Sequence, residues 1–242
     1  MSRSNPQGST NPCTKWFEWS GSAGSLYYYD KEKAEKVEVE MPFTFLVLDQ
    51  LSTITGYSDD QSAGIWSNEI RSTGTDRLVV RTKNGILGAG KYEDVKNLKG
   101  ARYTKSIYIA YYDEKKKLQL GNFKAVGAAL SSWIEFSKGK NLFKDAVTLG
   151  GSTKAKKGTT TYFIPEFTTK EVSEKTEEAA KELDVQLQAF LSEYINETQG
   201  VYDPVEERLT PPKDDLVPQW KMPAKDDNPF VEQEEDDDDI PF

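Results

Sequence analysis

The last sixth of the chain limits how much of it can fold. Residues 201–242 hold seven of the 11 prolines and carry 14 acidic against 4 basic side chains, with apolar residues only scattered among them. Such a segment cannot bury enough apolar surface to offset the conformational entropy lost on folding. We therefore expect a disordered acidic tail over 201–242, a disordered Ser/Asn/Pro/Gly-rich segment over 1–14, and one folded domain over 15–200.

Missing residue types exclude several kinds of chemistry. The chain has no histidine and one cysteine, Cys13, which excludes histidine catalysis, internal disulfides and cysteine-based zinc sites. The spacing of 85–91 is that of a P-loop, but Tyr92 stands where Ser or Thr is required. No carboxylate pattern suggests a metal site. We expect no enzymatic activity, no cofactor and no metal.

Apolar runs are too short for a membrane span. The longest, Phe43 to Leu48, has about six residues, whereas a span needs about 20. The N-terminus has no apolar stretch of the kind found in secretory signals. These features predict a cytoplasmic protein.

Charge is separated along the chain. The net charge is -5 over 1–70, +12 over 71–170, -6 over 171–200 and -10 over 201–242. A basic middle in an acidic chain is typical of a surface that binds a polyanion, with a charged tail attached. A solvated surface with uneven charge is the alternative.

Residue patterns between 15 and 200 predict mainly strands. Segments 43–48, 78–80, 106–112 and 159–163 are rich in β-branched and aromatic residues, and Asn84-Gly85 predicts a hairpin. Helical spacing of apolar residues predicts a helix over 122–138, with Asn122 as its N-cap. A second, amphipathic helix is expected to follow capping-box residues 168–171 and to end at Gly200.

This order predicts the fold class. It is mainly β, with an OB-fold five-stranded barrel that has a helix between strands three and four. A C-terminal amphipathic helix and the acidic tail follow. A generic antiparallel α+β domain would give a similar pattern.

The C-terminal tip is the most specific motif. Four acids precede an apolar anchor that also bears a free carboxylate: Asp236, Asp237, Asp238, Asp239, Ile240, Pro241 and Phe242. The acids would steer the tip toward a basic rim, and the proline would lower the entropy lost on docking. A similar segment twelve residues earlier, Asp226-Asp227-Asn228-Pro229-Phe230, is either a second docking motif or a coincidence.

This tip resembles the C-terminus of bacterial single-stranded DNA-binding proteins. The longer body before it resembles the bacteriophage proteins of that class. The resemblance implies binding of single-stranded DNA during phage replication, recombination or repair. It also implies that residues 236–242 recruit phage or host proteins of these processes, in the host cell cytoplasm if the protein is phage-encoded.

Candidate DNA contacts follow from what single-strand binders need, namely cations for phosphates and aromatic faces for bases. In the predicted strands, basic and aromatic side chains alternate with core residues and share one face. Three lysines are predicted in a loop between the last two strands, which flanks the groove in an OB-fold. For each aromatic residue, a place in the core is the alternative. The predicted set is Trp66, Arg77, Arg81, Lys83, Tyr92, Arg102, Tyr108, Tyr112, Lys154, Lys156 and Lys157.

The expected function is salt-sensitive binding of single-stranded DNA with little sequence preference. The tethered acidic tail is expected to compete with DNA for the basic surface. One alternative is a recombination mediator or strand-annealing protein. Another is an acidic adaptor of host replication proteins that does not bind DNA.

Overall fold

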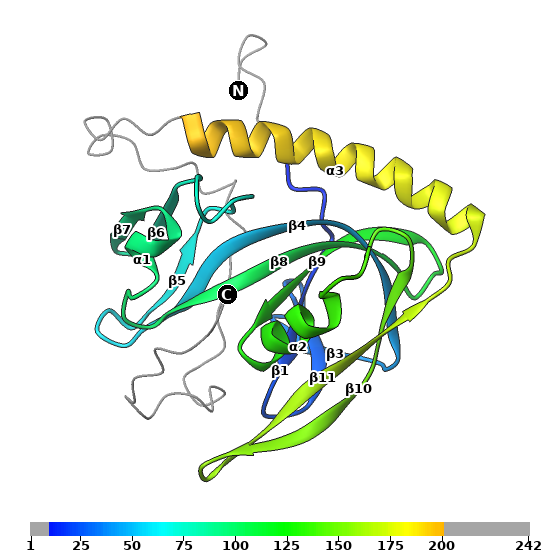
Figure 1. Cartoon of the computed structure of the whole chain (residues 1–242), viewed down its shortest axis with the longest axis horizontal. Coiled ribbons are helices and arrows are strands. Elements are labelled where there is room, and N and C mark those ends of the chain that lie inside the picture. Colours follow the sequence, from blue (N-terminus) through cyan, green and yellow to red (C-terminus); the bar gives the residue numbers. More distant parts are fainter. Residues whose placement is uncertain (1–9, 201–242) are drawn as a thin grey trace.

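The computed structural model describes residues 10–200, which are built around one large mixed β-sheet (Figure 1). In chain order the elements are β1 (Lys15–Ser20), β2 (Ser25–Asp30), β3 (Glu35–Val39), β4 (Phe43–Ser58), β5 (Ala63–Ser67), β6 (Leu78–Thr82), β7 (Gly85–Gly90), α1 (Tyr92–Val95), β8 (Ala101–Tyr112), β9 (Leu118–Val126), α2 (Ala128–Ser137), β10 (Ala146–Lys157), β11 (Thr160–Lys170) and α3 (Glu174–Gly200).

The sheet is open and forked. Its strand order is β3-β2-β1-β9-β8-β4-β5-β6-β7, and β10 and β11 branch from β4. The 16-residue strand β4 makes the fork, because its first residues pair with β10 and its last residues, Thr55–Ser58, pair with β5. Strand β8 runs along the opposite edge of β4 for most of its length. The strands are antiparallel except for β1 and β9.

The sheet curls so that its two branches approach each other. The Phe163 N–H of β11 donates to the Gly21 carbonyl in the turn between β1 and β2, at 2.8 Å. Trp19 Nε1 donates to the Phe163 carbonyl at 2.9 Å. Gly24 in the same turn has φ +72°, and a Cβ there would lie 2.8 Å from the Phe163 ring. A glycine is therefore required where the branches meet.

An aromatic core fills the inside of this curl. Phe17, Phe45 and Phe123 point inward from β1, β4 and β9, and all are almost fully buried. Trp133 of α2 packs on them, 6.3 Å from the Phe45 ring centre, and donates from Nε1 to Gln50 Oε1. We call this side of the sheet the inner face. Burial of each such ring contributes about 1.5–3 kcal/mol, so this cluster is a main source of stability.

Helix α3 covers the opposite side, the outer face (Figure 1). Its apolar stripe, which includes Leu187, Phe190 and Leu191, packs on Leu51 of β4 and on Tyr108 of β8. A third cluster lies beside α1, where Ile54, Ile65, Leu78, Val80 and Val95 are buried. Alternate residues of β8 thus face two different cores, one on each side of the sheet.

A mainly β body with a long C-terminal helix is confirmed, and the details differ. Instead of a five-stranded barrel, the described residues form an open sheet of 11 strands. The helix predicted between strands three and four is α2, which lies between β9 and β10. The hairpin predicted at Asn84-Gly85 is confirmed as β6–β7. Residues 201–242 and 1–9, predicted to be disordered, lie outside the described residues.

Three boundary predictions are wrong. Residues 10–14 belong to the body, because Cys13 is buried and the Thr14 N–H donates to the Leu120 carbonyl. Asn122 is not a helix cap, since β9 continues to Val126 and α2 begins only after Gly127, at φ +56°. Helix α3 begins later than expected, with the Ser173 hydroxyl accepting from the Thr176 N–H.

Candidate nucleic-acid interface

Four strands from distant parts of the sequence bring arginine and tryptophan into one row. On the outer face, Arg102 of β8 lies opposite Thr55 of β4. Thr55 lies opposite Trp66 of β5, which in turn lies opposite Arg81 of β6. Cross-strand partners project to the same side of a sheet with Cβ atoms about 4.5–5.5 Å apart. The cross-strand row, Arg102–Thr55–Trp66–Arg81, thus holds an indole ring with a guanidinium group to either side.

Strand alternation explains why the row faces outward. Ile54, Ile65 and Val80, the chain neighbours of Thr55, Trp66 and Arg81, are buried in the cluster beside α1. Successive side chains point to opposite faces, so this apolar set fixes the row on the outer face. The Thr55 and Thr104 hydroxyls hydrogen-bond at 2.6 Å across β4 and β8, which holds the two strands in this register.

The members of the row are half-buried. Burial lowers the pKa of the Arg102 guanidinium from its ordinary value, but an arginine side chain stays protonated in proteins. The Trp66 Nε1 atom is buried and has no hydrogen-bond partner among residues 10–200. The row therefore has two cations, one large π-face and one donor that no described acceptor satisfies.

Two further predicted residues lie near the row. Lys83 is exposed in the turn that follows β6. Arg77 precedes β6 and is tied to the end of α3, since its N–H donates to Gln199 Oε1 and its carbonyl accepts from Gln199 Nε2, both at 3.0 Å. The structure thus brings Trp66, Arg81 and Arg102 together and leaves these two at the border.

Two predicted stacking residues are not on this surface. Tyr108 is only 2% exposed, and its hydroxyl donates to Glu69 Oε2 at 2.6 Å, so the prediction that it lies on an open face is wrong. The prediction that Tyr108 projects from the outer face of β8 is correct, but α3 covers this part of that face. Tyr92 packs against the apolar cluster beside α1, with its ring 5.1 Å from that of Tyr103. It lies on the inner side, away from the row.

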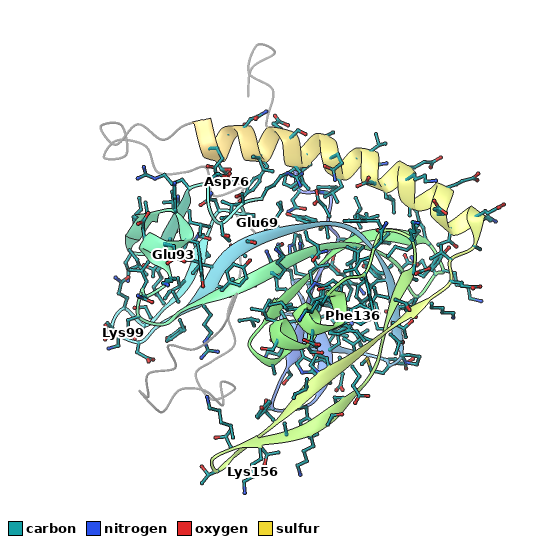
Figure 2. The ribbon with its side chains drawn as sticks, viewed as in Figure 1. Glu69, Asp76, Glu93, Lys99, Phe136 and Lys156 are labelled. Atoms are coloured by element: carbon teal, nitrogen blue, oxygen red, sulfur yellow. The ribbon has the colours of Figure 1, made fainter. Side chains whose placement is uncertain are left out.

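The remaining predicted residues lie elsewhere. Tyr112 is 51% exposed at the far end of β8, where its hydroxyl pairs with that of Thr176 at 3.0 Å. It lies ten residues from Arg102, which is about 33 Å along a strand. Lys154, Lys156 and Lys157 are exposed, but they form the end of β10 and not a loop. Figure 2 shows Lys156 at the tip of the β10–β11 hairpin.

Sequence reasoning missed a charged cluster beneath α3. Lys124 of β9 and Glu69 form an ion pair, and their side chains are only 6% and 8% exposed. Ser106 Oγ donates to Glu69 Oε1 at 2.7 Å, and Lys124 Nζ donates to Ser106 Oγ at 2.8 Å. Tyr194 of α3 completes the cluster, because its hydroxyl accepts from the Glu69 N–H at 2.9 Å. Lys124 occurs in an alternating strand pattern, but nothing in the sequence indicates its partner.

The Glu69 carboxylate is held in its charged form. Burial acts to raise the pKa of Glu69, but the Lys124 ammonium and the hydroxyl donors outweigh it and bring the pKa below its ordinary value. Burial also raises the pKa of Tyr108 well above its ordinary range, assisted by the Glu69 charge. These groups therefore serve as an internal polar support for α3 and not as ligands for DNA.

A second polar contact fixes α3 nearer its middle. Arg71 makes a bidentate pair with Asp49, at 3.1 and 3.0 Å, and Gln188 Nε2 of α3 donates to Asp49 Oδ2 at 3.0 Å. Burial raises the pKa of Asp49, but these donors more than offset it and lower the pKa overall. The helix therefore covers β4 and β8 through both apolar and polar contacts.

Within residues 10–200, no three potential metal ligands cluster together. None of the helices described is long and apolar enough to cross a membrane. The tip motif, Asp236 to Phe242, lies outside these residues.

Comparison with protein-family models, with curated proteins and with solved structures finds no match to this chain.

Proposed function

We propose that this protein binds single-stranded DNA and that the cross-strand row is the surface that contacts the bases. The observation that carries the proposal is the register that brings Trp66 between Arg81 and Arg102. Base stacking on aromatic rings combined with phosphate contacts from cations is the chemistry of sequence-tolerant single-strand binding. The net charge of +12 over 71–170, a range that includes both arginines, favours a polyanion as the ligand.

A single strand suits this surface better than a duplex. Unpaired bases can turn toward a sheet and stack on an indole ring, whereas a duplex keeps its base faces internal. The row is on a strand face, and a duplex reader would instead need a helix or ribbon that enters the major groove. We infer that contacts to base faces, and not to base edges, give the protein little sequence preference.

We also propose an OB-type arrangement for five of the strands. Strands β4, β8, β9, β10 and β11 have the required chain order, with α2 between the third and fourth of them. Strand β4 pairs with both β8 and β10, as the first strand of such a fold should. The link between β4 and β8 then contains β5, β6, β7 and α1, and β10 and β11 form a hairpin whose β10 end carries Lys154, Lys156 and Lys157. The tip of this hairpin corresponds to the loop between strands four and five, which binds nucleic acid in OB-folds.

Residues 236–242 are proposed to recruit other proteins of replication, recombination or repair. Their acids and the terminal Phe242 suit a pocket with a basic rim and an apolar floor. Deletion of 231–242 should abolish such binding and should tighten DNA binding at low salt, because it removes a tethered negative charge. Retained partner binding with unchanged DNA affinity would contradict this part of the proposal.

Fluorescence anisotropy of labelled oligo-dT tests the proposed function. We expect tight binding at about 50 mM salt, much weaker binding at about 200 mM, and little binding of a duplex of equal length. Fast pairing of complementary strands in the same assay would indicate a strand-annealing protein. No binding to oligo-dT, with or without 231–242, would overturn the proposal and favour an adaptor that does not bind DNA.

A further inference from the structure

We propose that single-stranded DNA has a second contact surface on the inner face of the sheet, between α1 and α2. This inner cluster comprises Ser52, Tyr92, Tyr103 and Lys105. The second contact rests on the proposed function and extends it, because one DNA strand would then touch both faces of the sheet.

Direct contacts join the four residues into one continuous cluster. The Tyr92 and Tyr103 rings lie 5.1 Å apart between centres, in an edge-to-face arrangement. The Tyr103 hydroxyl hydrogen-bonds to Ser52 Oγ at 2.7 Å, and Lys105 Nζ donates to the same oxygen at 3.2 Å. Tyr92, Tyr103 and Lys105 are each only half-buried. Two rings and a cation are therefore adjacent on one accessible surface.

Strand register explains why these side chains meet. Tyr103 of β8 lies opposite Ile54 of β4, which is buried in the apolar cluster beside α1. Two residues further along β8, Lys105 lies opposite Ser52. The next residue on this face, Ile107, is buried in the aromatic core. The inner cluster thus occupies the part of the inner face between two apolar cores, and Figure 1 shows α1 and α2 apart on either side of β8.

The charge of this segment suits a polyanion. Lys105 takes part in none of the ion pairs between residues 10 and 200, so its ammonium faces no carboxylate partner there. Lys91, directly before Tyr92, is exposed and is likewise absent from those pairs. Positions 91–105 hold five basic residues and two acidic ones. Cations beside accessible rings are what sequence-tolerant binding of a single strand uses.

The inner cluster and the cross-strand row lie back to back. Arg102 and Tyr103 are neighbours in β8, and successive side chains of a strand project to opposite faces. A DNA strand that touches both surfaces would pass round the end of the sheet where β8 begins. Figure 2 shows Lys99 at this end. Its ion pair with Asp60, at 3.3 Å, is exposed and therefore weak, so the ammonium is available to a phosphate.

Binding of oligo-dT of about 16 nucleotides, the upper range of site sizes for one such domain, tests the second contact. Tyr103→Leu should weaken binding about tenfold, as expected for the loss of one stacked base. Tyr103→Phe, which keeps the ring, should bind like the parent. Lys105→Met should reduce the slope of log K against log salt by about 0.7. Tyr112→Leu, at an exposed tyrosine of the same strand, is the matched control and should change neither quantity.

Lysine acetylation of the parent chain, read out by mass spectrometry, is a second measurement that needs no variant. Bound oligo-dT should protect Lys91 and Lys105 from the reagent. It should leave the exposed lysines at 115–117 as reactive as they are in the free protein. This measurement decides the question if Tyr103→Leu does not give a circular dichroism spectrum like that of the parent.

Three results would overturn the second contact while the proposed function stands. One is parent-like affinity in Tyr103→Leu when Trp66→Leu weakens binding. Another is an equal loss in Tyr103→Phe, which would assign the effect to the hydrogen bond with Ser52 and not to stacking. The last is unchanged acetylation of Lys105 in the oligo-dT complex. A parent chain that does not bind oligo-dT would instead overturn the proposed function itself.

Discussion

Two parts of the outer face of β8 have different surroundings. In the middle of the strand, Tyr108 and Ser106 lie beneath α3 and hydrogen-bond to Glu69. Where the strand begins, Arg102 joins Trp66 and Arg81 in a half-buried row. Both parts follow the same strand alternation. The difference shows that a polar strand face becomes internal support or candidate binding surface according to what packs on it.

The part of β8 that α3 covers should matter for stability, and the part in the cross-strand row should matter for binding. A buried ion pair that loses one partner leaves an uncompensated charge, whereas substitutions at a half-exposed row disturb little of the core.

Lys124→Met should lower the free energy of unfolding by about 3–5 kcal/mol, because it leaves the buried Glu69 carboxylate without its cation. Urea unfolding followed by circular dichroism measures the change. Lys83→Met, at an exposed position, is the matched control and should stay within about 0.5 kcal/mol of the parent. An equal loss in both variants would contradict the division.

The same ion pair predicts a pH dependence. The folded-state pKa of Glu69 is below its ordinary value, so its contribution to stability is fully present above the unfolded pKa of about 4.3. It is lost as the pH falls through the lower folded value. Acid titration of the parent should show this loss, and Lys124→Met should unfold at higher pH.

Trp66→Leu should weaken oligo-dT binding by about 1–3 kcal/mol, the usual value of one stacked base. Tyr108→Phe should leave DNA affinity unchanged, since that ring is buried under α3. Anisotropy titrations on variants with a parent-like circular dichroism spectrum provide the comparison. The proposal fails at this point if Tyr108→Phe weakens binding as much as Trp66→Leu.

Alanine at Lys154, Lys156 and Lys157 should reduce the salt dependence of DNA binding. Each phosphate contact on a single strand contributes about 0.7 to the slope of log K against log salt, so removal of three lysine ammonium groups should reduce the slope by about 2. Alanine at 115–117, three lysines at the turn between β8 and β9, is the matched control. Equal slopes for the two triple variants would show that the lysines of the β10–β11 hairpin do not contact DNA phosphates.

Glu18 of β1, which pairs in register with Lys124, gives a second pH dependence. Burial raises the pKa of Glu18 to about 7, although the Tyr27 hydroxyl donates to it at 2.7 Å. The folded state therefore holds a proton that the unfolded state releases, and stability should decline as the pH rises from about 4.3 toward 7. Glu18→Gln should flatten this decline in thermal unfolding, while Glu38→Gln, a control on the edge strand β3, should preserve it.

Local patterns in the sequence predicted much of the fold and part of the candidate site. Alternation of apolar and polar residues identified β6 and β8. It also correctly placed Arg81 and Arg102 on the strand face that points away from the core. It could not show that β5 would bring Trp66 between them, because that depends on pairing between strands far apart in the chain. Nor could it show that α3 would cover Tyr108, since an amphipathic stripe does not specify which face it meets.

Photocrosslinking is the most direct test of base contact at the cross-strand row. The full chain would be irradiated in complex with an oligonucleotide that contains 5-iodouracil, and the attached residues identified by mass spectrometry. We expect crosslinks at Trp66, with Tyr57, two residues beyond Thr55 on β4, as the next site. Crosslinks only at aromatic residues away from the cross-strand row, such as Tyr112 or Phe143, would contradict it.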